Sequence, residues 1–241
     1  MQHARHMTTL VIATRNRHKV GEIQAILGDG FRCLTLNDFP NAPQVVEDAP
    51  TFAGNAAKKA VALAEWLGRN AECEMRNREH GNRNAEMLVL ADDSGLEVDA
   101  LNGAPGVYSA RFAAMDGGGD VNSSDADNNA KLLRLLKDVP AERRVARFRC
   151  VIALAPVVSV EVENASPVCY ASEAELQTEF FEGACEGRID FAPHGEGGFG
   201  YDPLFIPNGH DRSFADLNSA VKNQISHRAR ALAKLRERLR S

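Results

Sequence analysis

Short apolar runs alternate with helical patterns along the first third of the chain. Residues 10–14 are almost entirely apolar, which is typical of a strand buried on both faces. After a polar turn, apolar residues recur at helical spacing as far as Gly28, where the sequence predicts that a helix ends. A second strand is expected at 31–36, and an alanine-rich helix with one apolar stripe at 51–68. Alternating strands and helices indicate an α/β fold.

The rest of the chain adds elements of the same kinds. A buried strand is expected at 87–91, with two adjacent acids at its end. Leucines at helical spacing predict a helix at 122–139, and a long strand is expected at 145–158. Residues 168–189 indicate one or two antiparallel strands, and a basic helix is expected at 222–240. We therefore predict an α/β fold with a mixed central sheet and flanking helices.

Two segments lack apolar periodicity. Residues 69–86 are charged and rich in asparagine, so we expect an exposed, mobile insertion there. Residues 1–7 are polar and lack the apolar core of a secretory signal, and we expect them to be either a leader or added residues before a natural start at Met7. The remaining chain, 8–241, is predicted to form a single domain.

The composition narrows the class of protein. Hydrophobic residues make up 44% and charged residues 25%, as in an ordinary globular protein, and the net charge of -5 argues against nucleic acid as a partner. No apolar run approaches the roughly 20 residues needed to span a bilayer, so no membrane partner is expected. The five cysteines are odd in number and form no C-x-x-C pair, which favours free thiols in a cytoplasmic protein.

The loop 14–19 joins the first strand to the first helix. A helix N-terminus offers backbone N–H groups and a positive dipole end, and together with Lys19 these favour a bound phosphate. The spacing of a Walker A loop is absent. The alternative is a plain polar turn in which Asn16 caps the helix. The loop alone leaves both interpretations open.

Two adjacent carboxylates, Asp92 and Asp93, precede Ser94 and a glycine. Carboxylate oxygens suit a hard cation such as Mg²⁺, and strand alternation sends neighbouring side chains to opposite faces. One of the two acids is therefore expected to face the metal while the other supports it. Glu47, in a separate acidic loop, could complete the ligand set. The alternative is a turn after a core strand, with Glu47 simply solvated.

The glycine-rich segment 195–200 matches G-x-G-x-x-G by coincidence. A dinucleotide-binding loop must open a helix, and Pro203 forbids a helix interior just after this segment. A better interpretation is a tight loop that presents Phe199 or Tyr201 as a flat face for a purine, with Asp202 as an acceptor. The alternative is a glycine hairpin with core aromatics.

The basic helix expected near the C-terminus carries cations at both ends. Ser226 or Asn223 is a candidate cap, and cations at the far end suit the helix dipole. Lys222, His227 and Arg228 lie near the expected start, where the dipole does not favour a cation. We therefore expect these three side chains to face a ligand.

Taken together, these segments resemble the inosine triphosphate pyrophosphatase family. The matching stretches, in collinear order, are 10–26, 51–60, 91–112, 147–154 and 197–232, which include ADDSGLEVD, GAPGVYSAR, GFGYDPLF and SHR. The resemblance implies an α/β fold with two lobes around a nucleotide-binding cleft, usually in a homodimer. It also implies Mg²⁺-dependent cleavage of non-standard purine triphosphates such as ITP, dITP and XTP, giving a monophosphate and pyrophosphate.

The resemblance also assigns roles by position. The resemblance implies that the triphosphate is bound by Thr14, Arg15, Asn16, Arg17, His18, Lys19 and Lys59, and that Ser94 is a further substrate contact. It implies that the base pocket is lined by Phe199, Gly200, Tyr201, Asp202, Lys222, His227 and Arg228. Glu47 and Asp93 would bind the magnesium, and Asp93 would also be the catalytic proton acceptor.

Two residues depart from the pattern of the family. Arg15 stands where many relatives have glycine or serine, and Gly54 replaces a common glutamate.

Two alternative functions remain open. A nucleotide-binding regulator without turnover is the alternative from another class of protein, and the intact set of Asp93, Glu47 and Lys19 counts against it. A pyrophosphatase for modified pyrimidine triphosphates is the alternative among enzymes, and the SHR motif favours purines.

Overall fold

The computed structural model describes residues 8–70, 87–119, 121–158 and 177–240. It divides into two compact units. The first unit comprises Met1–Asp92 and Ile152–Phe181, and the second comprises Asp93–Val151 and Glu182–Ser241. The expected leader and nearly all of the expected insertion lie outside the described residues.

The strands form one mixed sheet of order β2-β1-β3-β4-β5-β6. Their bounds are β1 Thr9–Ile12, β2 Arg32–Thr35, β3 Met87–Val98, β4 Val145–Pro156, β5 Glu179–Ile189 and β6 Phe205–Pro207. β1 pairs in parallel with both β2 and β3, whereas β5 and β6 are antiparallel. The mixed central sheet predicted from the sequence is thus confirmed.

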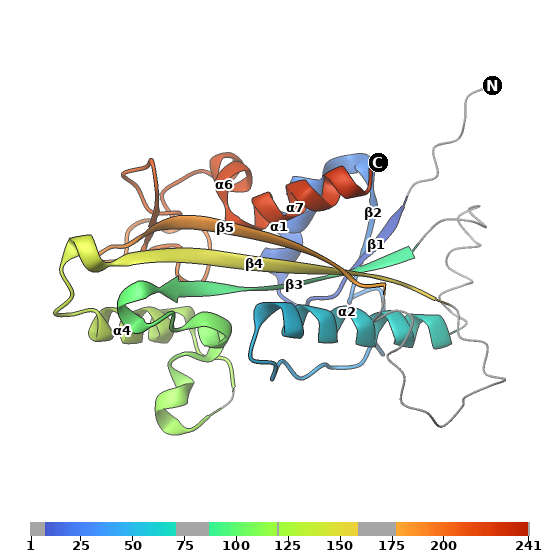
Figure 1. Cartoon of the computed structure of the whole chain (residues 1–241), viewed down its shortest axis with the longest axis horizontal. Coiled ribbons are helices and arrows are strands. Elements are labelled where there is room, and N and C mark those ends of the chain that lie inside the picture. The colour runs from blue at the N-terminus through green and yellow to red at the C-terminus, as the bar shows by residue number, and fades with distance from the viewer. Residues whose placement is uncertain (1–7, 71–86, 120, 159–176, 241) are drawn as a thin grey trace. The chain divides into compact units, whose positions relative to one another are not determined.

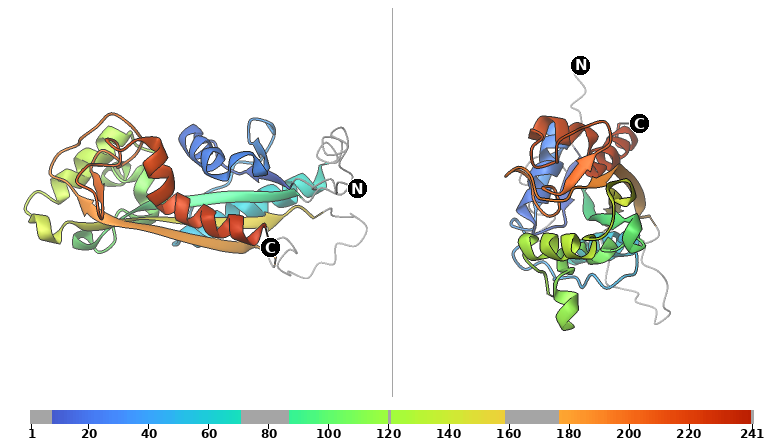
Figure 2. Two further views of the ribbon diagram at one scale, coloured as in Figure 1. Left: turned by 90° about the horizontal axis from the view of Figure 1, so that it is seen from above. Right: turned by 90° about the vertical axis from the view of Figure 1, so that its left-hand side faces the viewer.

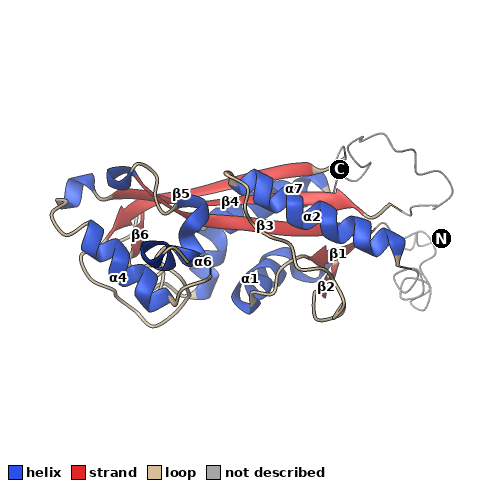
Figure 3. Cartoon of the chain, turned by 90° about the horizontal axis from the view of Figure 1, so that it is seen from below, coloured by secondary structure: helices blue, strands red, loops and turns tan. Residues whose placement is uncertain are grey.

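Two helices flank the strands of the first unit. α1 (Arg17–Leu27) and α2 (Phe52–Arg69) lie on opposite sides of the strands in Figure 1. α1 ends at Gly28, as predicted, and Thr51 caps α2 by accepting from the Gly54 amide at 3.1 Å. Figure 3 shows the long connection from β2 to α2 as a tan loop. Local sequence signals therefore set the C-terminal end of α1 and the N-terminal end of α2.

β3 is much longer than the strand predicted at 87–91. It continues to Val98, so Asp92 and Asp93 lie within the strand rather than at its end. Leu96 and Val98 are fully buried, and their burial keeps the chain extended past the acids. Because the two carboxylates interrupt the apolar run, the hydrophobic pattern alone does not predict that the strand continues.

The predicted helix at 122–139 is shorter in the structure. α4 spans Asp125–Leu135, because the Ser124 hydroxyl caps it by accepting from the Asp127 amide. Residues 122–124 therefore precede the helix. The strand predicted at 145–158 is present as β4, which ends at Pro156, and of the segment 168–189 the described part contains β5.

The predicted basic helix at 222–240 is two helices. α6 (Ser219–Ile225) and α7 (His227–Arg238) are separated at Ser226, whose backbone is extended. The Ser226 hydroxyl caps α7 by accepting from the Ala229 amide at 3.1 Å. Figure 2 shows the two red helices running in different directions. Lys222 consequently lies in the last turn of α6, where the helix dipole favours a cation, and not at a helix start as predicted.

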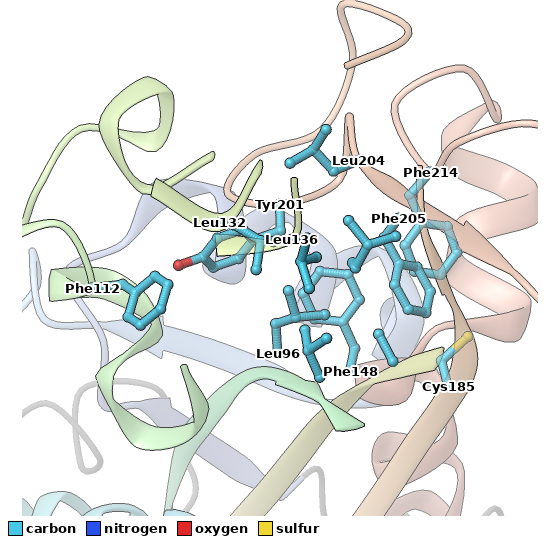
Figure 4. Packing of buried hydrophobic residues seen from close by; sticks show 13 residues of the cluster. Leu96, Phe112, Leu132, Leu136, Phe148, Cys185, Tyr201, Leu204, Phe205 and Phe214 are labelled. Atoms are coloured by element: carbon cyan, nitrogen blue, oxygen red, sulfur yellow. The ribbon is translucent and has the colours of Figure 1, made fainter. Parts of the chain in front are cut away.

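The second unit is built around an aromatic core, shown in Figure 4. Phe148 on β4 contacts Phe205 at a ring-centroid distance of 4.7 Å and Phe214 at 6.0 Å. The His227 imidazole stacks on Phe148 at 4.8 Å. These contacts pack the first residue of α7 against the sheet.

Within the described residues, no helix is long and apolar enough to cross a membrane.

The contact between β5 and α7 yields a stability prediction. A Cβ on Gly183 would overlap the His227 carbonyl and the Ala231 amide of α7. Gly183→Ala should therefore destabilise the protein by about 1–3 kcal/mol, because backbone cannot yield as a side chain can. A fall of several degrees in melting temperature would be measured by calorimetry.

Gly21→Ala is the matched control for this prediction. Gly21 lies in α1, and a Cβ there would meet nothing within 4 Å. Alanine should stabilise this helix by about 0.5–1 kcal/mol, so the two substitutions are expected to shift the melting temperature in opposite directions. Equal effects of the two substitutions would contradict the close approach at Gly183.

Candidate functional site

The loop 14–19 is ordered by Asn16. Its Oδ1 accepts hydrogen bonds from the backbone amides of His18 at 2.9 Å and Lys19 at 3.2 Å. The Asn16 cap that was considered for this turn is therefore present. Two of the amides expected to bind phosphate already have a partner, so an anion at this loop would depend on side chains or displace the cap.

The other side chains of this loop are mostly exposed. Arg15, Arg17 and His18 lie at the surface, and Arg15 donates from Nη2 to the Ala42 carbonyl at 3.3 Å. Thr14 accepts at Oγ1 from the Asn16 amide at 3.2 Å. The loop thus offers accessible cationic groups next to the start of α1.

Two lysines and two acids come together in the first unit. Lys19 forms an ion pair with Asp92 at 2.5 Å, and the Asp92 side chain is fully buried. Lys59 pairs with Glu47 at 2.6 Å and also donates to the Asp92 backbone carbonyl at 2.8 Å. Asp92 therefore holds one lysine with its carboxylate and another with its carbonyl. We call Lys19, Glu47, Lys59 and Asp92 the lysine cluster.

The acidic loop that carries Glu47 is tied to α2 at two successive positions. Beside the Glu47–Lys59 pair, Asp48 forms an ion pair with Lys58 at the surface. The hydrogen bond from Lys58 lowers the pKa of Asp48. The Asn55 Oδ1 accepts from the Ala49 amide at 2.8 Å and fixes the same loop. These contacts fix where Glu47 lies.

Asp93 begins the second unit and is 7% exposed. As neighbours within β3, Asp92 and Asp93 send their side chains to opposite faces, as the sequence predicted. Among the described residues, no group of three or more His, Cys, Asp and Glu side chains gathers as a metal centre would. A magnesium ion commonly takes only one or two carboxylates and completes its shell with water and phosphate oxygens, so Glu47 and Asp93 each carry the type of ligand group that this ion takes.

A buried ion pair lies at the centre of the second group of predicted residues. Asp202 and Lys222 pair at 2.5 Å, with side chains only 3% and 7% exposed. The same Asp202 oxygen accepts from the Phe199 amide at 2.9 Å. A Cβ on Gly198 would overlap this carboxylate, which explains the glycine there. In the structure Asp202, which was predicted as an acceptor for the base, thus fixes the loop around Phe199.

Two cations lie beside the Phe199 ring. The Lys222 ammonium lies 4.9 Å from the ring centroid and the Arg228 guanidinium carbon 5.9 Å. Arg228 is 1% exposed and donates from Nη2 to the Ser94 hydroxyl at 2.9 Å. Ser94, Phe199, Asp202, Lys222 and Arg228 therefore form one group, which we call the Phe199 cluster.

Tyr201 and His227, two further predicted base-pocket residues, lie in the hydrophobic core. Tyr201 is 4% exposed and donates its hydroxyl to the Ser109 carbonyl at 2.9 Å. Burial raises the pKa of this phenol. The His227 ring is covered by Phe148. The structure thus places Tyr201 as a core aromatic, which was the alternative interpretation of the glycine-rich segment.

Gly200 is contacted by two residues that the sequence analysis missed. Asp125 and Asn129 of α4 hydrogen-bond to its backbone. The only available signal was their spacing, since residues four apart share one face of a helix.

The buried pair of the Phe199 cluster makes a stability prediction. Asp202→Asn should destabilise the protein by about 3–5 kcal/mol, because the Lys222 ammonium is left buried without its counter-charge. Urea unfolding followed by circular dichroism would measure the loss.

The double substitution Asp202→Leu with Lys222→Met is the control. Replacing a buried ion pair with apolar side chains is often nearly neutral, so most of the lost stability should return. If the single and double variants were equally unstable, the ion pair would not account for the loss.

Comparisons with known proteins identify the family of the chain. The model of the Ham1 family matches residues 10–238. The dITP/XTP pyrophosphatase of Shouchella clausii is 42% identical over 231 residues, covering 96% of each chain, and that of Desulforamulus reducens is 45% identical over 229 residues, covering 95% of this chain and 94% of the relative. A solved HAM1 protein from Coxiella burnetii has a TM-score of 0.73 and 34% identity, covering 97% of this chain and 99% of that chain. A nucleoside-triphosphatase, or dITP/XTP pyrophosphatase, from Mycobacterium abscessus has a TM-score of 0.62 and 35% identity, covering 95% and 98%. With its family model and its relatives both matching nearly end to end, the chain belongs to the Ham1 family.

Proposed function

We propose that the protein hydrolyses non-standard purine nucleoside triphosphates, such as dITP, XTP and ITP, to the monophosphate and pyrophosphate. The observation that carries the substrate class is the Phe199 cluster, in which two buried cations lie beside one aromatic ring. An aromatic face suits stacking on a base, and cationic N–H donors suit a carbonyl on the base edge. Relatives named dITP/XTP pyrophosphatase at 42% and 45% identity support the same substrates.

The donors of the Phe199 cluster account for discrimination against adenine. Hypoxanthine and xanthine carry a carbonyl at C6, whereas adenine carries an amino group there. Lys222 or Arg228 would meet an acceptor in the first case and another donor in the second. Each buried polar group left unpaired costs about 1–3 kcal/mol, and sites built to bond one group can reject its analogue by about 10⁴–10⁵.

The lysine cluster supports binding of the triphosphate. Lys19 and Lys59 are held by acids in the first unit, so two ammonium groups are already placed. Their charges complement a polyanion, and the exposed Arg15, Arg17 and His18 side chains can add donors. We propose that this group and the loop 14–19 bind the phosphates.

Glu47 and Asp93 are the proposed carboxylate ligands of a magnesium ion. A bound magnesium ion supplies positive charge against the phosphate oxygens that become more negative during cleavage. Asp93 is the proposed acceptor of a proton from the attacking water, since an oriented carboxylate can act as a general base. Assembly as a homodimer completes the proposal and rests on the family resemblance alone.

Product analysis is the direct test of the proposed function. With Mg²⁺, ITP and XTP should yield one monophosphate and one pyrophosphate per turnover, measured by ion-exchange chromatography. Chelation of the metal should stop the reaction. Release of orthophosphate through a diphosphate would exclude cleavage between the α- and β-phosphates. A protein that binds ITP without turnover would instead be the regulator considered above.

Asp93→Asn and Asp92→Asn separate the two acids of β3. Asp93→Asn should lower kcat by about 10²–10⁴, because the proposed general base is removed. Asp92→Asn should mainly raise KM, because Asp92 holds Lys19 and does not take the proton. Steady-state kinetics on ITP, with circular dichroism to verify folding, would measure both. An Asp93→Asn enzyme of full activity would remove Asp93 from the mechanism.

A further inference from the structure

α4 contacts both backbone polar groups of Gly200. The Asp125 Oδ2 accepts from the Gly200 amide at 2.6 Å, and the Asn129 Nδ2 donates to the Gly200 carbonyl at 3.0 Å. Asp125 and Asn129 lie one helical turn apart, so one face of a single helix makes both contacts. The position of Gly200 is therefore fixed relative to α4.

Gly200 directly follows Phe199, and the backbone of this pair is held both by α4 and by Asp202. Gly200 has a left-handed φ of 65°, which α4 secures. Asp202 accepts a hydrogen bond from the Phe199 amide at 2.9 Å. The distances from the Phe199 ring to Lys222 and Arg228 depend on where this backbone lies. A contact to Gly200 can thus act on the ring without touching it.

Asn129 differs from its neighbour Asn128 in how its amide is used. Asn128 uses both ends of its amide, accepting from the Ala113 amide at 2.8 Å and donating to the Ala110 carbonyl at 3.2 Å. Asn129 donates to Gly200, while its Oδ1 is buried without a hydrogen-bond partner among the described residues. A buried polar atom without a partner costs about as much as one hydrogen bond gains. Asn129 therefore adds little net stability, and its effect is to place Gly200.

We propose that Asp125 and Asn129 are positioning residues for base selection. They act through the Gly200 backbone, which sets where Phe199 lies relative to the cations of the Phe199 cluster. This inference rests on the proposed function, because it assumes that Phe199 stacks on the purine. It adds α4 to the elements that determine specificity.

Kinetics of three variants test the proposal. Asp125→Ala, Asp125→Asn and Asn129→Ala are compared with the wild type on ITP and ATP in the presence of Mg²⁺. Displacing Phe199 should lower kcat/KM for ITP on the order of 10- to 100-fold, mainly through KM, and should lower it less for ATP. The ITP/ATP ratio should therefore fall. Asp125→Asn keeps an acceptor oxygen and should lose less than Asp125→Ala.

Matched substitutions on the same helix serve as controls. Asp127→Asn removes an exposed charge from the same first turn of α4 and should leave the ITP/ATP ratio unchanged. Asn128→Ala should lower the melting temperature, because both of its buried hydrogen bonds are lost. Asn129→Ala should leave the melting temperature almost unchanged. A merely structural role for Asn129 would instead lower the melting temperature of Asn129→Ala and leave its ITP/ATP ratio unchanged.

Hydrogen exchange measures the backbone contact independently of activity. Amides in peptides covering 195–203 should exchange faster in Asp125→Ala than in the wild type, and Asp127→Asn should show no such change. Unchanged exchange in Asp125→Ala, or an unchanged ITP/ATP ratio in both alanine variants, would overturn the role of α4. Wild-type turnover of ITP is measured first. Its absence overturns the proposed function, whereas turnover with an unchanged ratio in the variants overturns only this inference.

Discussion

The Asp202 carboxylate accepts hydrogen bonds from the Phe199 amide and the Lys222 ammonium in the interior of the second unit. Without it, the buried lysine would lose the carboxylate that balances its charge, and the turn around Phe199 would lose one of its anchors. The glycine at 198 follows from the same oxygen, because no Cβ fits beside it. Three features of the Phe199 cluster therefore depend on one side chain.

Burial of an ion pair is a weak source of stability, since removing two charges from water costs about as much as their attraction returns. The pairs of the lysine cluster and of the Phe199 cluster are better explained by placement. Each pair fixes an ammonium group that would otherwise sample many rotamers. In the lysine cluster the fixed groups are Lys19 and Lys59, and in the Phe199 cluster it is Lys222. Cations held in this way keep little conformational entropy to lose when an anion or a base binds.

The sequence predicted those features that local chemistry controls. Gly28 ends α1, Ser226 caps α7 and the apolar run at 145–158 forms β4, since each depends on near neighbours. It missed features that depend on tertiary contacts. β3 continues beyond two acids because Leu96 and Val98 are buried in the core of the second unit. Tyr201 and His227 have side chains that suit ligand binding or packing equally well, and only the fold distinguishes the two uses.

The hydrogen bonds from α4 and from Asp202 to the Phe199 turn go to its main chain. Asp125 and Asn129 bond to the backbone of Gly200, and Asp202 bonds to the backbone amide of Phe199. None of these hydrogen bonds involves the side chain at 199, so a different residue there would keep the same anchor. The backbone of the turn should therefore keep its position when another side chain replaces the Phe199 ring. Position 199 is a natural starting point for redesigning which bases the protein accepts.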